Sequence, residues 1–451
     1  MSSTYYILGS GPVGVIVASY LLEKGNNVEL IDNSGIQKSI TKDIPKKFTY
    51  KKINKQIFSE FFQTIDDNRN VVLPVSSRTV GGFTEVWGGT LNNYDNLDFL
   101  NWPVNNKDLI NEYLYLKKTI TLMFDLDESC NITSLQEEYD DLTNNIYNFL
   151  SRNSKKLNNN NLFFKKSILF LKNGKTWSSS ELLILLKERF PNNLNHITNF
   201  ETIELFEEGE EIRLLSEKEE IKINNKKLFV ATGYFSSAYL ATSLLNKNKF
   251  NIKDSELRVV PFIWLGKSSK NINSSTHPQL FFDIKNDNKK TIRTQLYSLN
   301  SEVISSIGEN NIFYKILLTF FNKLLANRLY LNFIYSHSNV SDNYDFQMKN
   351  NKIHMLNKTK VKNYDGLKVI GVFLRNFFLT FLLPLPAIKK FPPYGSFHAG
   401  ACSFINSSDG RTSDKSNIHF IDSSVFEDIP SGPITFTSMS VGLKIVKDAI
   451  K

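Results

Sequence analysis

With 451 residues the chain is long for one compact domain, and we expect two or three. Its 41% hydrophobic and 22% charged residues exclude an intrinsically disordered protein. The net charge of +9 comes from lysines scattered among asparagines, as in residues 153–161, which argues against a nucleic-acid-binding protein. The two distant cysteines, Cys130 and Cys402, exclude a disulfide framework and a cysteine-based zinc site, so we expect a reducing compartment and no metal.

Residues 5–32 carry the first motif. An apolar strand runs into Gly-Ser-Gly-Pro-Val-Gly at positions 9–14, a helix-like segment continues to Lys24, and a second strand finishes at Asp32. This order is typical of a dinucleotide-binding unit, and it favours a nucleotide site over a fortuitous glycine turn. Asp32 can accept hydrogen bonds from an adenosine ribose without a 2′-phosphate, which fits NAD and FAD equally well.

Each glycine of this motif has its own physical role. Gly9 makes the turn, Gly11 lets a pyrophosphate touch the backbone, and Gly14 lets the helix pack closely on the strand. The helix that starts at Pro12 and Val13 offers free N–H groups to the phosphates. Gly9, Gly11 and Gly14 therefore predict a phosphate-binding turn.

Residues 81–89 read GGFTEVWGG, with four glycines in nine positions. An interior glycine costs a helix or strand roughly 0.5–1 kcal/mol, so this stretch is predicted as a loop whose backbone a ligand approaches closely. A glycine-rich surface hairpin is the alternative. Glu85 within the loop is interpreted as a solvated carboxylate, with a catalytic role as the alternative.

Two further strand–helix units follow. Residues 226–245 contain a buried strand, an Ala-Thr-Gly turn with Thr232 and Gly233, and a helix. Residues 417–450 give a strand that ends at Asp422, then a loop and a helix. Alone, each fits any α/β protein. Together with the first unit they look like the interrupted FAD-binding domain of flavoprotein oxidoreductases.

Six stretches resemble the glucose-methanol-choline (GMC) family of FAD-dependent oxidoreductases, and most of all its sugar-oxidising branch. They span the N-terminal quarter, a short middle stretch and about the last fifty residues. Roughly residues 115–220 and 255–390 carry no motif of the family. The matching stretches are residues 9–32, 77–89, 101–114, 230–240, 397–404 and 418–426.

The resemblance implies an α/β fold: a Rossmann-like FAD-binding domain assembled from discontinuous segments, with an inserted α+β substrate domain. We expect the FAD-binding domain in residues 1–100, 196–260 and 391–451. The substrate domain is then expected in residues 101–195 and 261–390.

The resemblance also implies where FAD would bind. Gly81, Gly82 and Thr84 would contact the flavin, with Trp87 packed behind them. Branch members with a covalent flavin carry a histidine at the position of Val86, so we expect non-covalent FAD. The expected cofactor-binding residues are Gly9, Gly11, Pro12, Val13, Gly14, Asp32, Gly81, Gly82, Thr84, Trp87, Thr232, Gly233, Asp422, Ser423 and Thr435.

Alcohol oxidation by a flavin needs a base for the hydroxyl proton, and a neutral histidine suits that role. Of the six histidines, His398 lies in a small-residue turn that matches the family's catalytic element. The family's second partner, a His or Asn, falls on Pro433, which has no side-chain donor or acceptor. Ser431 or Thr435 could replace it, one histidine could suffice, or alcohol oxidation could have been lost.

Two apolar segments in the middle, residues 311–335 and 369–395, are predicted as helices packed on a sheet. The second is long enough to span a bilayer at ~20 residues, but Arg375 and Pro384 within it argue against a free span. The alternative is a basic, aromatic membrane-surface patch that delivers a lipid or lipid-linked substrate.

We therefore expect a cytoplasmic FAD-dependent oxidoreductase that oxidises a small alcohol, a sugar or a lipid-linked sugar, with contact to the inner membrane face as an open alternative. The rivals are a flavoenzyme of other chemistry (reduction, isomerisation or decarboxylation) and a non-catalytic FAD-binding protein. The sequence does not indicate whether oxygen, a quinone or a redox protein reoxidises the flavin.

Overall fold

The structure is a computed structural model, and every structural statement below refers to the residues that it describes. These are residues 2–34, 64–65, 71–72, 77–85, 87, 89–90, 94, 102, 104, 107–122, 141–166, 171–172, 175–267, 280–285, 291–298, 316, 319–320, 328–349, 352–359, 361–390 and 399–451.

A five-stranded parallel sheet forms the centre of the first unit. It lies in the order β23-β12-β1-β2-β8, so the first strand along the chain is central and later strands are added on both sides of it. This order is the Rossmann arrangement and confirms the predicted fold class. The strands are β1 (Thr4–Leu8), β2 (Asn27–Ile31), β8 (Leu194–Ile197), β12 (Leu228–Val230) and β23 (Ile418–Phe420).

Helix α1 (Pro12–Glu23) follows β1, as the glycine motif predicts. Gly11 is its N-cap and Pro12 its first residue, a position where the missing N–H of proline removes no helical hydrogen bond. At the other end Gly25 has a φ of 78°, the left-handed conformation that commonly ends a helix. The local sequence thus sets both ends of α1.

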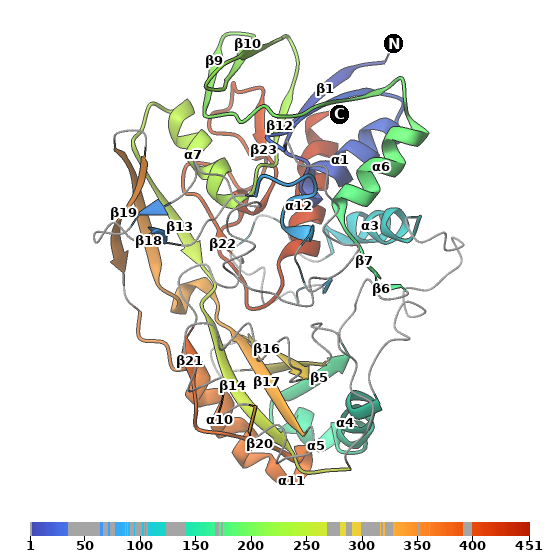
Figure 1. Cartoon of the computed structure of the whole chain (residues 1–451), viewed down its shortest axis with the longest axis vertical. Helices are drawn as coiled ribbons and strands as arrows, with labels where there is room; N and C mark the ends of the chain where they lie inside the picture. Colours follow the sequence, from blue (N-terminus) through green and yellow to red (C-terminus); the bar gives the residue numbers. More distant parts are fainter. Residues whose placement is uncertain are drawn as a thin grey trace.

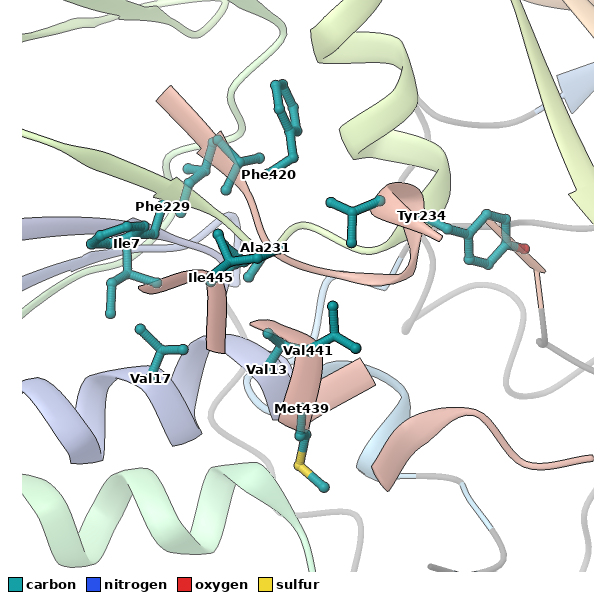
Figure 2. Close-up of a cluster of buried hydrophobic side chains, with 14 of the residues drawn as sticks. Ile7, Val13, Val17, Phe229, Ala231, Tyr234, Phe420, Met439, Val441 and Ile445 are labelled. Atoms are coloured by element: carbon teal, nitrogen blue, oxygen red, sulfur yellow. The ribbon is translucent and has the colours of Figure 1, made fainter. Parts of the chain in front are cut away.

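Helix α12 (Thr435–Ala449) packs beside α1. Gly442 allows the close approach, because a Cβ there would lie 2.5 Å from Val13 Cγ1 and 2.3 Å from the Ile421 carbonyl oxygen. Figure 2 shows the buried cluster where the two helices meet the strands. Its labelled members are Ile7, Val13, Val17, Phe229, Ala231, Tyr234, Phe420, Met439, Val441 and Ile445.

Two helices from the range expected in the substrate domain pack in this first core instead. Helix α3 (Ile110–Leu122) contacts α12 and α1, and α6 (Ser179–Arg189) contacts α1. Their apolar side chains, such as Leu116 and Leu182, belong to the same cluster as the parallel sheet. These two helices therefore belong to the first unit, while the remaining domain boundaries stay a prediction.

A meander and a helix complete the other side of the parallel sheet. The antiparallel strands β9 (Glu204–Glu208), β10 (Glu211–Leu215) and β11 (Glu220–Asn224) lead from β8 to β12. Helix α7 (Tyr234–Leu244) follows β12, as predicted, and packs on β9 and β13.

A six-stranded sheet, in the order β22-β13-β18-β19-β3-β4, packs against α7. Phe235 of α7 lies edge-on to Phe250 and Phe346 of this sheet, with ring centroids 5.4 and 5.1 Å away. The sheet therefore shares the core of the first unit. Its strands are β22 (Ala399–Gly400), β13 (Lys249–Asp254), β18 (Asn343–Lys349), β19 (Lys352–Thr359), β3 (Thr64–Ile65) and β4 (Val71–Val72).

The second unit is an antiparallel sheet in the order β20-β14-β17-β16-β15-β5, with β21 also paired to β14. Its strands are β20 (Leu382–Pro384), β14 (Leu257–Trp264), β17 (Leu329–Tyr335), β16 (Thr291–Ser298), β15 (Leu280–Lys285), β5 (Leu162–Lys166) and β21 (Lys389–Lys390). Four helices accompany it: α4 (Asp141–Arg152), α5 (Ser154–Asn159), α10 (Asp365–Arg375) and α11 (Phe377–Thr380).

Helices α4, α5 and α10 share a second hydrophobic core with this sheet, separate from the first. Figure 1 shows the four helices at the lower end of the molecule, with the parallel sheet and both marked chain ends at the upper end. The remaining described elements are β6 (Leu171–Lys172), β7 (Lys175–Thr176) and the short 3-10 turns η2 (Gly82–Glu85), η5 (Ser338–Val340) and η6 (Ser423–Val425).

The prediction of a helix over residues 311–335 is wrong for its last part. Residues 329–335 form β17, which pairs with β14 and β16. Both faces of this strand are largely buried, so its sequence lacks the alternation that identifies a half-exposed strand. In residues 369–395 the helices end at Thr380, and β20 and β21 then join the sheet. In the described parts of the chain, no helix has the length and apolar character needed to cross a bilayer.

Candidate functional site

The carboxyl ends of the parallel strands meet where the strand order reverses. Gly9 follows β1, Ala231 follows β12, Asp32 follows β2, and residues 421–422 follow β23. In open parallel sheets, ligands bind at this switch point, which here lies between β1 and β12. The residues predicted from the first and later β–α units are therefore on one edge of one sheet.

The three glycines of the first motif are explained in two different ways. A Cβ at Gly9 would lie 2.5 Å from the Ala231 carbonyl oxygen, and a Cβ at Gly14 would lie 2.0 Å from that of Gly9. The packing of the chain itself therefore requires glycine at these two positions. A Cβ at Gly11 would approach no described atom closer than 3.9 Å. The space beside Gly11 is left open, as expected where a ligand touches the backbone.

The carboxylate of Asp32 is buried beside this turn. Its Oδ2 accepts hydrogen bonds from the hydroxyls of Ser10 and Ser34, the latter at 2.8 Å. Among the described residues all contacts of this carboxylate fall on Oδ2, so Oδ1 keeps its lone pairs for an outside donor such as a ribose hydroxyl. Ser10 also ties Asp32 to the glycine turn.

His196 lies beside Asp32 and is a residue that the sequence did not single out. Its side chain is 2% exposed, and its Nε2 lies 3.8 Å from Asp32 Oδ2. Neither ring nitrogen has a hydrogen-bond partner in the part of the chain that the structure describes. A buried polar group left unsatisfied costs about 1–3 kcal/mol. Only the pairing of β8 with β2 brings His196 here, and no local sequence signal reports that pairing.

The loop predicted at residues 81–89 packs on the dinucleotide turn. The Gly81 N–H donates to Ser10 Oγ at 3.1 Å. Gly82 has a φ of 60°, and a Cβ there would lie 3.4 Å from Gly11 Cα. Two glycine-rich backbones therefore lie side by side at the strand ends, which places Gly81 and Gly82 with the other candidate residues.

Residues 177–180 hold this loop from behind. Thr84 Oγ1 and Ser179 Oγ are 2.7 Å apart, and Trp87 Nε1 donates to the Trp177 carbonyl oxygen at 2.8 Å. The side chains of Thr84 and Trp87 thus contact this segment, which starts helix α6. The sequence Ser178-x-x-Glu181 signals a helix start, and Ser178 does accept from Glu181 N–H, but nothing in it announces the contact with the loop.

Glu85, predicted as a solvated carboxylate, is buried instead. Its carboxyl group fills the place of the missing Gly81 side chain, where a Cβ would lie 2.2 Å from Glu85 Oε1. Burial raises the pKa of Glu85 to about 7, while neighbouring Ser180 and Ser178 oppose the rise and Glu181 adds to it. Neither carboxyl oxygen reaches normal hydrogen-bond geometry with a described group. The glycine at position 81 is therefore explained by Glu85 itself.

Asp422 joins two of the predicted segments. Its Oδ2 accepts from Gly233 N–H at 2.9 Å and from the Ser237 hydroxyl at 2.5 Å, and its Oδ1 accepts from Ser424 N–H at 2.9 Å. Burial raises the pKa of Asp422, and these hydrogen bonds oppose the rise. The hydroxyl of Thr232 lies 2.9 Å from that of Ser237. Asp422 thus fixes the Ala-Thr-Gly turn against the end of β23, and its contact with a cofactor stays a prediction.

His398 lies outside the described residues, but the chain directly after it is placed. Ala399 accepts a hydrogen bond from the Ser423 hydroxyl at 2.8 Å, and Ala401 N–H donates to the Ser423 carbonyl oxygen at 3.0 Å. A Cβ at Gly400 would lie 2.0 Å from that same carbonyl oxygen, so glycine is required there. The residues that follow His398 therefore pack on the end of β23.

The segment before α12 meets the second unit. Gly432 accepts a hydrogen bond from the Tyr94 hydroxyl at 2.9 Å, and a Cβ at Gly432 would lie 2.6 Å from Arg293 Cδ. Arg293 is fully buried and pairs through Nε with Asp283 Oδ1 at 2.6 Å. Burial alone would raise the pKa of Asp283, but the Arg293 guanidinium lowers it overall. The antiparallel sheet thus carries a buried ion pair against the turn that contains Pro433.

Three residues of this turn bear on the expected second active-site group. Pro433 is buried, and Thr435 begins α12 and is half-buried. The Ser431 hydroxyl is buried and has no hydrogen-bond partner among the described residues. The Ser431 hydroxyl is therefore a buried donor that no described residue uses.

These features fit a dinucleotide at the strand ends. The open space beside Gly11, the unused Oδ1 of Asp32 and the unpartnered ring of His196 all lie at this edge. The first turn of α1 adds free backbone N–H groups, since Gly11 supplies no capping side chain. Where the structure describes the chain, no group of three or more His, Cys, Asp or Glu residues is arranged to hold a metal ion.

The chain therefore has a Rossmann-like α/β fold with an additional β domain. Among solved structures, the crystal structure of pyridoxine 4-oxidase from Mesorbium loti has the same fold, with a TM-score of 0.62 over 99% of each chain and 10% sequence identity. At that identity the likeness shows the fold alone. No protein-family model matches the chain, and none of the curated proteins compared with it matches either.

Proposed function

We propose that this chain is an oxidoreductase that binds FAD non-covalently and oxidises the hydroxyl group of an alcohol, with sugars and glycolipid-like alcohols as the leading substrate class. The observation that carries the proposal is the meeting of the two glycine-rich backbones, around Gly11 and Gly82, at the switch point beside Asp32. The shared fold with a protein named as an oxidase supports the reaction class.

In this proposal the described residues hold the cofactor. The N–H groups at the start of α1 would bind the pyrophosphate, and Asp32 would accept a hydrogen bond from the adenosine ribose. The loop at Gly81 and Gly82 would contact the flavin, with Thr84 and Trp87 fixed behind it by residues 177–180. When bound, FAD supplies the two-electron acceptor for the hydride that leaves the alcohol carbon.

The chain then has to handle the proton and the developing charge. His398 takes the hydroxyl proton while the alcohol becomes a carbonyl compound. Ser431 donates to the substrate oxygen in place of the His or Asn that GMC enzymes have at the position of Pro433, because its buried hydroxyl has no described partner.

Pro433 keeps a second candidate function open. It is buried and offers no side-chain hydrogen bond where the GMC pattern has a catalytic partner. A flavoenzyme of other chemistry, such as reduction, isomerisation or decarboxylation, would not need that partner. A non-catalytic FAD-binding protein is the third candidate.

The test is anaerobic photometric titration of the purified, yellow protein with a panel of alcohols. Only alcohol oxidation bleaches the flavin under these conditions, so bleaching with one alcohol class is the expected result. Acid precipitation should release FAD into the supernatant, since Val86 offers no attachment point. A flavin that stays oxidised with every alcohol, or colour that stays with the pellet, would contradict the corresponding part of the proposal.

The adenosine end of the site gives a sharper prediction. Asp32→Ala should weaken FAD binding at least about tenfold, because a hydrogen bond to a charged acceptor contributes about 1.5–3 kcal/mol.

His196→Leu should weaken FAD binding by about fivefold, since a hydrogen bond between neutral groups contributes about 1 kcal/mol. FMN, which lacks the adenosine, should bind both variants as tightly as it binds the wild type. Flavin fluorescence quenching on the apoprotein measures the affinities of the wild type and of both variants for FAD and for FMN.

His419→Leu is the matched control for this measurement. His419 is also buried in the parallel sheet, but it lies on the opposite edge strand β23, where its Nδ1 is 2.8 Å from the Asp409 carbonyl oxygen. It should lower stability without changing the ratio of FAD to FMN affinity. Equal losses of FAD and FMN affinity in the Asp32 and His196 variants would place neither residue at the adenosine.

A further inference from the structure

Helices α10 and α11 expose bulky apolar side chains on their outer surface. Leu367, Leu374 and Phe378 are 59%, 50% and 82% exposed. Leu367 and Leu374, seven residues apart on α10 with the exposed Gly371 between them, share one face of that helix, and Phe378 follows on α11. The opposite face is anchored, because Val369 and Phe373 are fully buried in the second core. These apolar side chains are therefore exposed although the helix itself is anchored in the second core.

The same surface is basic. Lys368 and Arg375 are exposed on α10, and residues 361–390 contain a single acidic residue, Asp365, which is buried. Lys368 Nζ lies 3.8 Å from an oxygen of Asp365, so part of its charge is balanced. Arg375 has no acidic partner among the described residues.

Helices α4 and α5 extend this basic surface. Asn160 Nδ2 donates to Asn376 Oδ1 at 2.6 Å, and Asn153 Nδ2 donates to the Leu379 carbonyl oxygen at 3.3 Å, so α5 lies directly beside α11. Residues 151–160 contain no acidic residue. They expose three cations, Arg152, Lys155 and Lys156.

We propose that this surface is a docking face for a membrane that contains anionic lipids. The docking face consists of Leu367, Leu374 and Phe378 with the flanking cations Lys368, Arg375, Arg152, Lys155 and Lys156. Exposed apolar side chains next to exposed cations match the boundary between acyl chains and anionic headgroups. A protein partner would have to supply acidic side chains and an apolar pocket at once, whereas an anionic bilayer supplies both over any area.

The position of the docking face suits this role. Figure 1 shows α4, α5, α10 and α11 together at one end of the molecule, with the parallel sheet at the other. A protein resting on this end would keep the strand-end site away from the lipid headgroups. The inference does not depend on the proposed oxidation, because no residue of the docking face belongs to the candidate site.

The experiment is co-sedimentation of the full chain with vesicles. Vesicles of phosphatidylcholine with 30% phosphatidylglycerol, as a working composition, should bind the wild type at low salt, and pure phosphatidylcholine should bind it much less. Phe378→Ser with Leu374→Ser should weaken binding by about tenfold or more, through lost apolar burial. Lys368→Gln with Arg375→Gln should weaken it by about 25-fold, at roughly fivefold for each cation. Raising the salt concentration to 0.5 M should also weaken vesicle binding, because salt screens the attraction between the cations and the anionic lipids.

Ile184→Ser is the matched control, since Ile184 is 53% exposed on α6, at the other end of the molecule. It should leave vesicle binding unchanged, and melting curves should show every variant folded, because all the substituted side chains are exposed. The proposal is overturned if the wild type does not sediment with anionic vesicles, or if the double variant with Phe378→Ser and Leu374→Ser binds as tightly as the wild type. A concentration-dependent dimer that Phe378→Ser abolishes would overturn it in favour of a second copy of the chain.

Discussion

Between pH 4 and pH 8, the difference in free energy of unfolding between Glu85→Gln and the wild type should shift by about 3 kcal/mol in favour of the variant. Burial raises the pKa of Glu85 to about 7 from an ordinary value of 4.5. Each unit of pKa shift corresponds to about 1.4 kcal/mol between the two protonation states. The folded protein therefore holds the Glu85 proton over a range of pH in which the unfolded chain has already released it.

The sign follows from this difference in proton binding. Below pH 4.5 both states hold the proton, and the full contribution of the buried neutral acid to stability is present. As the pH rises to about 7 only the unfolded state releases its proton, so the free energy of unfolding falls. Glutamine has no proton to release, and the contribution of all other groups cancels in the comparison.

Urea unfolding of both proteins, as apoprotein across pH 4–8, measures this difference. A difference between wild type and Glu85→Gln that stays constant with pH would mean that Glu85 is ionised in the folded state. Glu181→Gln is the control, because Glu181 lies next to the same serines but is only partly buried. The Glu181→Gln protein should keep most of the pH dependence of the wild type, because Glu85 is still present.

His398→Ala should slow the reduction of the flavin by an alcohol about 10²–10⁴-fold, the usual contribution of a positioned general base. FAD binding and the fold should be unaffected, and reduction by dithionite should proceed at the wild-type rate, because that route removes no proton from an alcohol. The wild-type rate should fall at low pH, because a protonated imidazole cannot accept the hydroxyl proton. Stopped-flow spectroscopy of the anaerobic reaction gives these rates.

His419→Leu serves as the control here as well, since the ring of His419 is held by the Asp409 carbonyl oxygen and takes no part in the proposed reaction. A folded, FAD-replete His398→Ala protein that reacts with the alcohol at the wild-type rate would remove His398 from the mechanism. Because Pro433 cannot accept a proton, alcohol oxidation would then have no base left in the GMC pattern.

The parts of the fold that the sequence predicted are those with short-range signals. The β1–α1–β2 unit is specified by glycine spacing, by Pro12 at the helix start and by Gly25 at its end, all within one stretch of chain. The units around β12 and β23 follow for the same reason, because a buried strand, a turn and a helix are adjacent in each. Neighbouring residues suffice to define such units.

The features that were missed depend on partners far away in the sequence. Strand β17 is buried on both faces, so its run of apolar residues does not distinguish a helix from a strand. Glu85 became buried only because residues 177–180 pack on the loop, and His196 joins the site only because β8 pairs with β2. No single stretch of sequence contains the information for contacts of this kind.

The wide separation of β1 and β23 in the chain has a consequence for synthesis on the ribosome. The parallel sheet cannot close until residues 418–420 have been made, although β12 at residues 228–230 is complete long before. At about 5–20 residues per second that interval is roughly ten to forty seconds. During it the apolar edge of β12 and the face of α1 that later receives α12 stay uncovered. A nascent chain of this protein should therefore keep these apolar surfaces exposed until α12 (Thr435–Ala449) has emerged from the ribosome.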